Sequence, residues 1–260
     1  MNTKDEVPAV NGKIVVITMA ALALTSPAIA SADNTVQQLT YNFTYSADQS
    51  TSAKDSANPA EDYSGGGSHT GLMQGGTSSY TGSLSDKGTM TVQILGKQQD
   101  GGLIVNIAEN GENVRRAPSA ACVVYGNTRV ICDPNKTVYT EEYTLLRFLG
   151  QNFIDPSNLD AHRHWQIVQN SPTMSVTADY TLGPTTSSDV SVNETRKIRQ
   201  SGGGSLTTDV QAKIGYDMSR SIPTAIDEYV TQRHDNGVVG TSTTIYQTTF
   251  ALASDTTAKI

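Results

Sequence analysis

The chain of 260 residues has few charged side chains, at 17%, and few aromatic ones, at 6%. Its formal net charge is −7, and it has no stripe of Lys and Arg of the kind that phosphate contacts require. The one dense basic cluster, Arg196-Lys197-Ile198-Arg199, falls on a predicted strand end. We interpret it as a solvated face or edge, where Lys and Arg discourage strand addition. Nucleic acid is therefore not an expected partner.

Apolar runs of membrane length are also missing. The longest, Ile14–Leu24, is shorter than the roughly 20 residues that span a bilayer. A polar segment precedes it, and small residues suited to cleavage after Ala30 or Ala32 follow it. This layout predicts a secretory signal peptide over residues 1–32, with a retained anchor as the alternative. We expect residues 33–260 to be exported to the periplasm, cell surface or exterior, without a stable membrane anchor.

Cysteine is scarce, and the two present, Cys122 and Cys132, form an isolated pair. In an exported protein such a pair favours a disulfide. A three-residue hairpin loop, with Tyr125 facing Arg129, puts the two cysteines directly opposite each other, whereas a two-residue loop puts them on opposite faces. We therefore predict the three-residue register and a disulfide that contributes about 2–3 kcal/mol. The spacing matches neither a redox Cys-x-x-Cys motif nor a zinc set.

The chain is rich in Ser, Thr and Gly, and its apolar residues recur with a period of two. The clearest case is residues 206–252, which predict three consecutive strands. Pro223 and the turn signal Asn236-Gly237 separate them. Similar patterns predict further strands at residues 36–46, 80–84, 88–95, 103–107, 120–125, 129–133, 161–168, 174–182 and 190–198.

Residues 47–79 consist mainly of Ser, Gly, Asp, Ala and Thr. Few of these side chains could offset the entropy lost on ordering, so this segment is predicted to be a long flexible loop. One strand in front of it cannot be a domain. Residues 33–260 are therefore expected to form a single β-rich domain.

One convincing helix is predicted over residues 140–150, with Thr140 as its cap and Gly150 at its end. Acidic residues in the first turn suit the helix dipole. A helix of about ten residues is marginal alone, so it must pack on the sheet. Its broad apolar face supplies the candidate ligand-binding residues Leu145, Leu146, Phe148 and Leu149.

These elements predict a mostly β (α+β) fold of about ten strands and one main helix. Strands adjacent in sequence and joined by hairpins form antiparallel sheets. We expect one strongly curved sheet, a half-barrel, that wraps around the helix. A β-sandwich of two sheets is the alternative.

Catalytic patterns are weak. His162 and His164, two apart on a predicted strand, are the weak metal candidates; Asp160 could join them, and the third ligand would come from His69 or His234. A half-exposed polar face is the plainer interpretation.

Three further patterns partly resemble catalytic or phosphate-binding motifs. Residues 66–70 match a serine-hydrolase elbow in four of five positions but lie in the predicted loop. Asp227 and Glu228 are neighbours on a strand, so they point to opposite faces and cannot form a glycosidase pair by themselves. The glycine clusters Gly65–Gly67 and Gly202–Gly204 do not precede a helix, so neither indicates a phosphate loop. No cofactor is expected.

The signal peptide, the β-meander, the cysteine hairpin CVVYGNTRVICDPNK (residues 122–136) and the closing residues 216–224 look like those of uncharacterised exported bacterial proteins. In architecture, residues 36–252 are similar to the periplasmic half-barrels of the LolA-like lipoprotein carriers. That resemblance implies a lipid held between a curved sheet and its covering helices.

Three function classes follow. The first is an exported, non-enzymatic domain that holds a hydrophobic ligand or envelope component between sheet and helix. The second is a structural or interaction protein of the cell envelope or exterior, with an envelope protein as partner. The third is a metal-dependent enzyme that uses His162 and His164.

Overall fold

The computed structural model describes residues 35–53, 79–113, 115–126, 128–135, 138–150, 163–186, 188–202, 204–235, 237 and 240–259. These residues form eleven strands and one helix. In chain order the elements are β1 Thr35–Ala53, β2 Ser79–Lys97, β3 Leu103–Gly111, β4 Arg115–Val124, β5 Val130–Cys132, α1 Thr140–Leu146, β6 His164–Asn170, β7 Met174–Thr185, β8 Asp189–Ser201, β9 Ser205–Asp217, β10 Ile222–Asp235 and β11 Gly240–Lys259.

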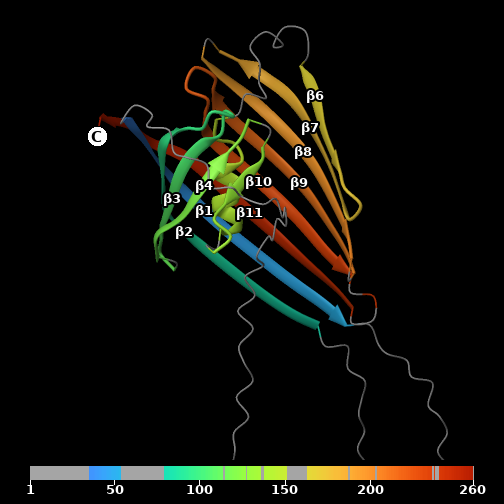
Figure 1. Cartoon of the computed structure of the whole chain (residues 1–260). Coiled ribbons are helices and arrows are strands. Elements are labelled where there is room, and N and C mark those ends of the chain that lie inside the picture. Colours follow the sequence, from blue (N-terminus) through green and yellow to red (C-terminus); the bar gives the residue numbers. More distant parts are fainter. Residues whose placement is uncertain are drawn as a thin grey trace, which may run out of the picture.

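All eleven described strands belong to one open antiparallel sheet, in the order β5-β4-β3-β2-β1-β11-β10-β9-β8-β7-β6. Figure 1 shows this sheet twisting and curving around α1, which lies on its concave side. The predicted curved antiparallel sheet with one helix is therefore confirmed, with eleven strands where about ten were expected. The two-sheet sandwich is not what the described strands form.

The first and last strands pair with each other at the middle of the sheet. β1 and β11 run side by side from Thr35 opposite Lys259 to Ala53 opposite Gly240, with a bulge after Thr40. From β1 the chain works outward by neighbouring strands to β5, and from β6 it works back inward to β11. Because α1 lies between β5 and β6 in the chain, it belongs to the connection between the two outer edges.

The core lies on the concave face, where the period-two patterns of both halves of the sheet meet α1. Tyr41 and Phe43 of β1, Val105 and Ile107 of β3, and Ile214 of β9 are each at most 2% exposed. They belong to one apolar cluster that includes side chains of α1 and of the turn after it. Burying an aliphatic or aromatic side chain of this size contributes about 1.5–3 kcal/mol, so this cluster is what holds α1 on the sheet.

The cysteine hairpin has the predicted register. Cys122 of β4 lies opposite Cys132 of β5, the two are joined by a disulfide, and their Cα atoms are 4.0 Å apart. The Tyr125 N–H donates to the Arg129 carbonyl at 2.9 Å, which closes a three-residue loop. The predicted disulfide, and the three-residue register chosen to allow it, are both confirmed.

The predicted loop over residues 47–79 is wrong at its start, because β1 continues to Ala53. Residues 47–53 pair with β11 on one side, and residues 47–52 pair with β2 on the other. Backbone hydrogen bonds on both sides order this Ser/Thr-rich segment, a gain that composition does not reveal. Residues 54–78 lie outside the described residues, as do the predicted signal peptide and its two predicted cleavage sites.

The helix α1 is shorter than the predicted range 140–150, because it ends at Leu146, and its N-cap is Tyr139 and not Thr140. The Tyr139 N–H donates to the Glu142 carboxylate at 2.9 Å, so an acidic side chain of the first turn satisfies this donor. After α1, residues 147–150 form a turn that ends at Gly150 with φ +58°, the conformation that favours glycine after a helix. A Cβ at Gly150 would lie 2.2 Å from the Leu103 side chain, so this end packs directly on β3.

Candidate functional site

The four candidate ligand-binding residues lie together on the concave side of the sheet. Leu145 and Leu146 are in α1, and Phe148 and Leu149 are in the turn that follows. Each has no exposed surface, and each belongs to the main core cluster. The sequence therefore identified the apolar side chains between helix and sheet.

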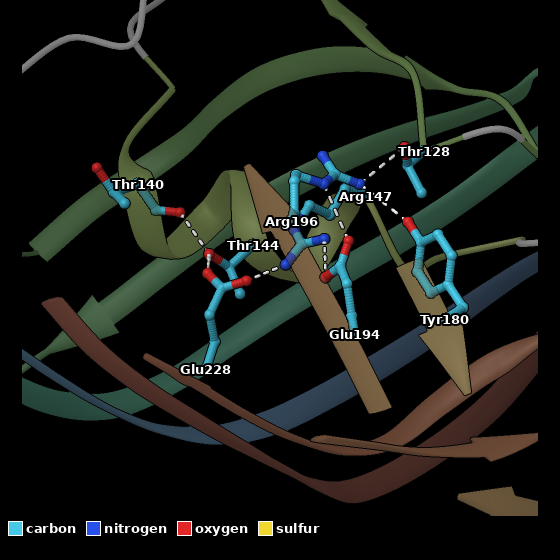
Figure 2. A network of polar contacts seen from close by, with 8 residues as sticks. All are labelled: Thr128, Thr140, Thr144, Arg147, Tyr180, Glu194, Arg196 and Glu228. Atoms are coloured by element: carbon cyan, nitrogen blue, oxygen red, sulfur yellow. Dashed lines mark hydrogen bonds and ion pairs between the residues drawn. The ribbon is translucent and has the colours of Figure 1, made fainter. Parts of the chain in front are cut away.

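Between them, Arg147 points into a buried network of charged and polar side chains that Figure 2 shows. Its Nη1 donates to Glu194 Oε2 at 2.6 Å, and its Nη2 donates to Glu228 Oε2. These side chains are only 4%, 0% and 4% exposed. The guanidinium also lies over the Phe148 ring, with its Cζ 4.0 Å from the ring centre.

A second guanidinium, that of Arg196, shares the Glu194 carboxylate. Arg196 Nε donates to Glu194 Oε1 at 2.9 Å, and its Nη2 lies 3.0 Å from the Tyr180 hydroxyl and 3.1 Å from Thr128 Oγ1. Thr128 belongs to the loop between β4 and β5, whereas Arg196 is in β8. This contact therefore joins two parts of the sheet that are far apart in strand order. Through it, the loop of the cysteine hairpin contacts β8, near the opposite end of the sheet.

The helix has two further attachments to the sheet. Thr144 Oγ1 lies 2.6 Å from Glu228 Oε1, and the Gly150 N–H donates to the Ser221 carbonyl at 2.9 Å. Together with the two ion pairs of Arg147, these bonds fix both α1 and the turn after it to β8, β10 and the turn before β10. The polar atoms thus hold the helix in one position.

The charges of the network balance, because it contains two guanidinium groups and two carboxylates. Burial opposes charge on Glu194, but Arg147 and Arg196 outweigh it and hold the pKa of Glu194 below its ordinary value of 4.5. Burial likewise opposes charge on Arg147, and Glu194 and Glu228 raise its pKa above the ordinary value. Each charge therefore depends on its partners, as buried ion pairs generally do.

The interpretation of Arg196-Lys197-Ile198-Arg199 as a solvated edge is wrong for Arg196, which is 7% exposed on an interior strand. A signal for this was present in the sequence. In β8 the period-two set Val190, Val192, Glu194 and Arg196 places two charges on the apolar face, and all four are buried. Glu228 occupies the same kind of position in β10, between Ile226 and Val230.

Of the histidines, His164 is 60% exposed, and its Nε2 lies 3.5 Å from Asp179 Oδ1. His234 is half-buried at the far end of β10. His162, Asp160 and His69 lie outside the described residues. Within the described part of the chain, no group of three or more His, Cys, Asp and Glu side chains is arranged to hold a metal ion.

The remaining catalytic candidates are either placed clearly or lie outside the described residues. Glu228 is buried in the network while Asp227 is exposed, so the two neighbours do point to opposite faces. Residues 66–70 lie outside the described residues. Among the described residues, no helix combines the length and the apolar character needed to cross a membrane.

A pocket of about 280 Å³ lies away from α1, near the ends of β1, β2 and β11. The side chains that line it alternate along the strands with those that face the concave side. Asp48 lies opposite both Ile245 and Ser83, whereas the neighbouring Ala47 lies opposite Tyr246 of the core face. The pocket is thus on the convex face. It is lined mainly by Ser, Thr and Asp side chains.

Comparison with known proteins finds no matching family model and no matching curated protein sequence. The site is consequently defined by its own geometry, a helix fixed onto an apolar concave face by a buried ion network.

Proposed function

We propose that this chain is an exported, non-enzymatic structural or interaction protein of the cell envelope or exterior. In this proposal its curved sheet with α1 is a closed scaffold, and its outer surfaces bind other macromolecules. The observation that carries the proposal is the attachment of Arg147 to both Glu194 and Glu228 in the interior. Removing one partner from a buried ion pair costs about 3–5 kcal/mol. A helix held this way is a poor lid for a ligand that must enter and leave.

Export is supported by the disulfide between Cys122 and Cys132, since such bonds form and persist in oxidising compartments. It is also supported by the signal-peptide pattern at the N-terminus.

A second candidate function is carriage of a hydrophobic ligand, as the resemblance to LolA-like carriers implies. It is favoured by the position of Leu145, Leu146, Phe148 and Leu149, which face the concave side of a curved sheet. In this case the ligand would replace contacts that these side chains now make with the core.

Native and denaturing mass spectrometry of the exported protein separates the two proposals. The scaffold proposal expects the mass of the bare polypeptide under native conditions, two hydrogens below the fully reduced value. An added mass of lipid size that is lost on denaturation would contradict it and support the carrier.

Truncation of the helix face gives an independent test. If Leu146 is part of a filled core, Leu146→Ala should lower the free energy of unfolding by about 2–5 kcal/mol. If Leu146 lines a ligand cavity, the ligand-free protein should lose little stability and the variant should bind the ligand differently. Leu95→Ala, at a 38% exposed position in β2, is the matched leucine control.

A further inference from the structure

The outer edge of the sheet at β6 has the features of a strand that receives another strand. β6 is the last strand of the sheet, and among the described residues no strand pairs with its outer side. Its seven residues pair one to one with β7 from His164 to Asn170, without a bulge. A regular edge of this length presents a row of backbone donors and acceptors.

The hydrogen bonds that flank β6 show which of its backbone groups point outward. The Leu182 N–H donates to the Arg163 carbonyl at 2.8 Å, and the Ser171 N–H donates to the Met174 carbonyl at 2.7 Å. Odd-numbered residues therefore face β7, because the direction alternates along an antiparallel strand. The N–H and C=O groups of the even-numbered residues face the outer edge: His164, Gln166, Val168 and Asn170.

The side chains of β6 lack the usual protection of an edge. Its sequence, HWQIVQN, contains no Lys, Arg, Asp, Glu or Pro, the residues with which proteins discourage strand addition. Val168 is 52% exposed, and Gln166 and Asn170 are also exposed. Chemically, this edge is open to a further uncharged strand.

We propose that β6 pairs antiparallel with β6 of a second copy of this chain, about a two-fold axis at Ile167. In that register Gln166 lies opposite the partner's Val168, and His164 lies opposite the partner's Asn170. Each outward-facing residue then exchanges two hydrogen bonds with its opposite residue, which gives about eight in all. The odd-numbered residues, Trp165 among them, stay on the concave side in both copies.

The second copy is favoured because β6 is complementary to itself, with no charged side chain to repel its own copy. The net charge of −7 opposes association elsewhere on the surface, so two copies meet most easily at an uncharged edge such as this one. The two-fold register sets no like charges opposite each other. The surface buried between two seven-residue strands is small compared with the roughly 1,200–2,000 Å² buried in a standard stable interface. A weak, concentration-dependent dimer is therefore expected. This pairing goes beyond the proposed function and holds with or without a ligand.

Charge substitutions on β6 test both the pairing and its register. Gln166→Lys with Val168→Lys places lysine opposite lysine at two points of the axis, and the dissociation constant should rise about tenfold or more. Gln166→Lys with Val168→Glu places lysine opposite glutamate, so the affinity should return to the original value or exceed it. Asp179, which accepts from Gln166 Nε2 at 2.7 Å, is equally available to the lysine introduced by Gln166→Lys in both variants.

The measurement is sedimentation velocity of the protein recovered after export, from about 5 µM to about 500 µM. Tyr229→Lys, on the interior strand β10 and 44% exposed in the unchanged protein, is the matched control and should leave association unchanged. A protein that stays monomeric throughout the range overturns the proposal. A dimer that responds equally to both double variants overturns the β6 register. A dimer that is weakened by Tyr229→Lys overturns β6 as the interface.

Discussion

The two outer edges of the sheet, β5 and β6, differ in nearly every property that decides whether an edge stays closed. β5 has three residues, a disulfide to β4 and Asp133-Pro134 directly after it. The loop that leads into it contacts Arg196 of β8 through Thr128. β6 has seven residues, no charged or proline side chain and no covalent tie. Within the described part of the chain, β5 is a short edge tied to its neighbours, whereas β6 is a longer edge without such ties.

This difference indicates where stability and association reside in the molecule. The β5 side is connected to the buried ion network, which also fixes α1, so substitutions there should lower the free energy of unfolding. The neighbouring strands β7 and β8 supply Tyr180, Glu194 and Arg196 to that network, whereas the exposed side chains of β6 itself point away from it. Substitutions of those exposed β6 side chains should therefore change contacts between molecules. Four predictions test this division, beginning with the largest expected effect.

Replacing Arg147 with methionine should have the largest effect. Methionine keeps the apolar contact with Phe148 but leaves Glu194 and Glu228 buried without their shared cation. We expect a loss of about 3–5 kcal/mol in the free energy of unfolding, measured by urea denaturation at pH 7.

Arg220→Ala is the matched control, because Arg220 also bridges two carboxylates, Asp217 and Asp255, but its side chain is 42% exposed. Exposed pairs are screened by solvent, and this variant should lose less than about 1 kcal/mol. Equal losses for the two arginines would show that the buried network has no special role.

Removing the disulfide with Cys122→Ala and Cys132→Ala should cost about 2–3 kcal/mol, because the bond closes a short loop in the unfolded chain. The three-residue β5 should also open locally, so its amide hydrogens should exchange faster than those of β3. Hydrogen exchange followed by mass spectrometry measures the local opening, and urea denaturation measures the loss of stability. Unchanged exchange in β5 would mean that the Thr128–Arg196 contact and β-pairing suffice to close this edge.

The stability should fall in acid through Glu194. Its pKa is lower in the folded protein than the ordinary 4.5, so its stabilising effect is complete above pH 4.5 and is lost as the pH falls through the depressed value. Glu194→Gln removes the charge but keeps the shape and an oxygen that can accept from the arginines, so it should cost about 1–3 kcal/mol at pH 7, less than the loss of a whole charged partner. The difference between the two proteins should shrink below pH 4.5. A difference that stays constant down to the acid transition would rule out Glu194 as the titrating group.

The smallest effect on stability is expected for Val168→Lys at the β6 edge. The side chain is on the convex face and half exposed, so the free energy of unfolding should change by no more than about 0.5 kcal/mol. Self-association should weaken in the same sample, as measured by sedimentation. A loss of stability as large as that of Arg147→Met would contradict the expectation that substitutions at the β6 edge affect association and not stability.

Much of the fold could be predicted from sequence because it rests on local patterns. The period of two marked the strands, and the expected disulfide selected the hairpin register that sets Cys122 opposite Cys132. The helix was found from its apolar face and from Gly150. The end of β1 was missed because the Ser- and Thr-rich residues 47–53 are ordered by neighbours on β11 and β2 that are distant in sequence.

The ion network was missed for a related reason. The alternation in β8 places Glu194 and Arg196 on the apolar face, but it does not show what meets them there. Their partners come from the turn after α1 and, through Thr128, from the loop before β5. Only the curvature of the sheet brings these segments together. Arg196 was wrongly interpreted as solvated because its sequence neighbours are basic and exposed, whereas the segments that bury it are distant in sequence.

The scaffold proposal requires that α1 is a fixed part of the core and not a lid, and native-state hydrogen exchange measures this property directly. Amides of a fixed helix exchange only when the whole domain unfolds. We predict that the amides of Leu145 and Leu146 exchange with a free energy close to that of global unfolding. Exchange of these amides at a much lower free energy, while Ile107 and Ile214 in the sheet stay protected, would contradict a fixed helix and indicate a lid.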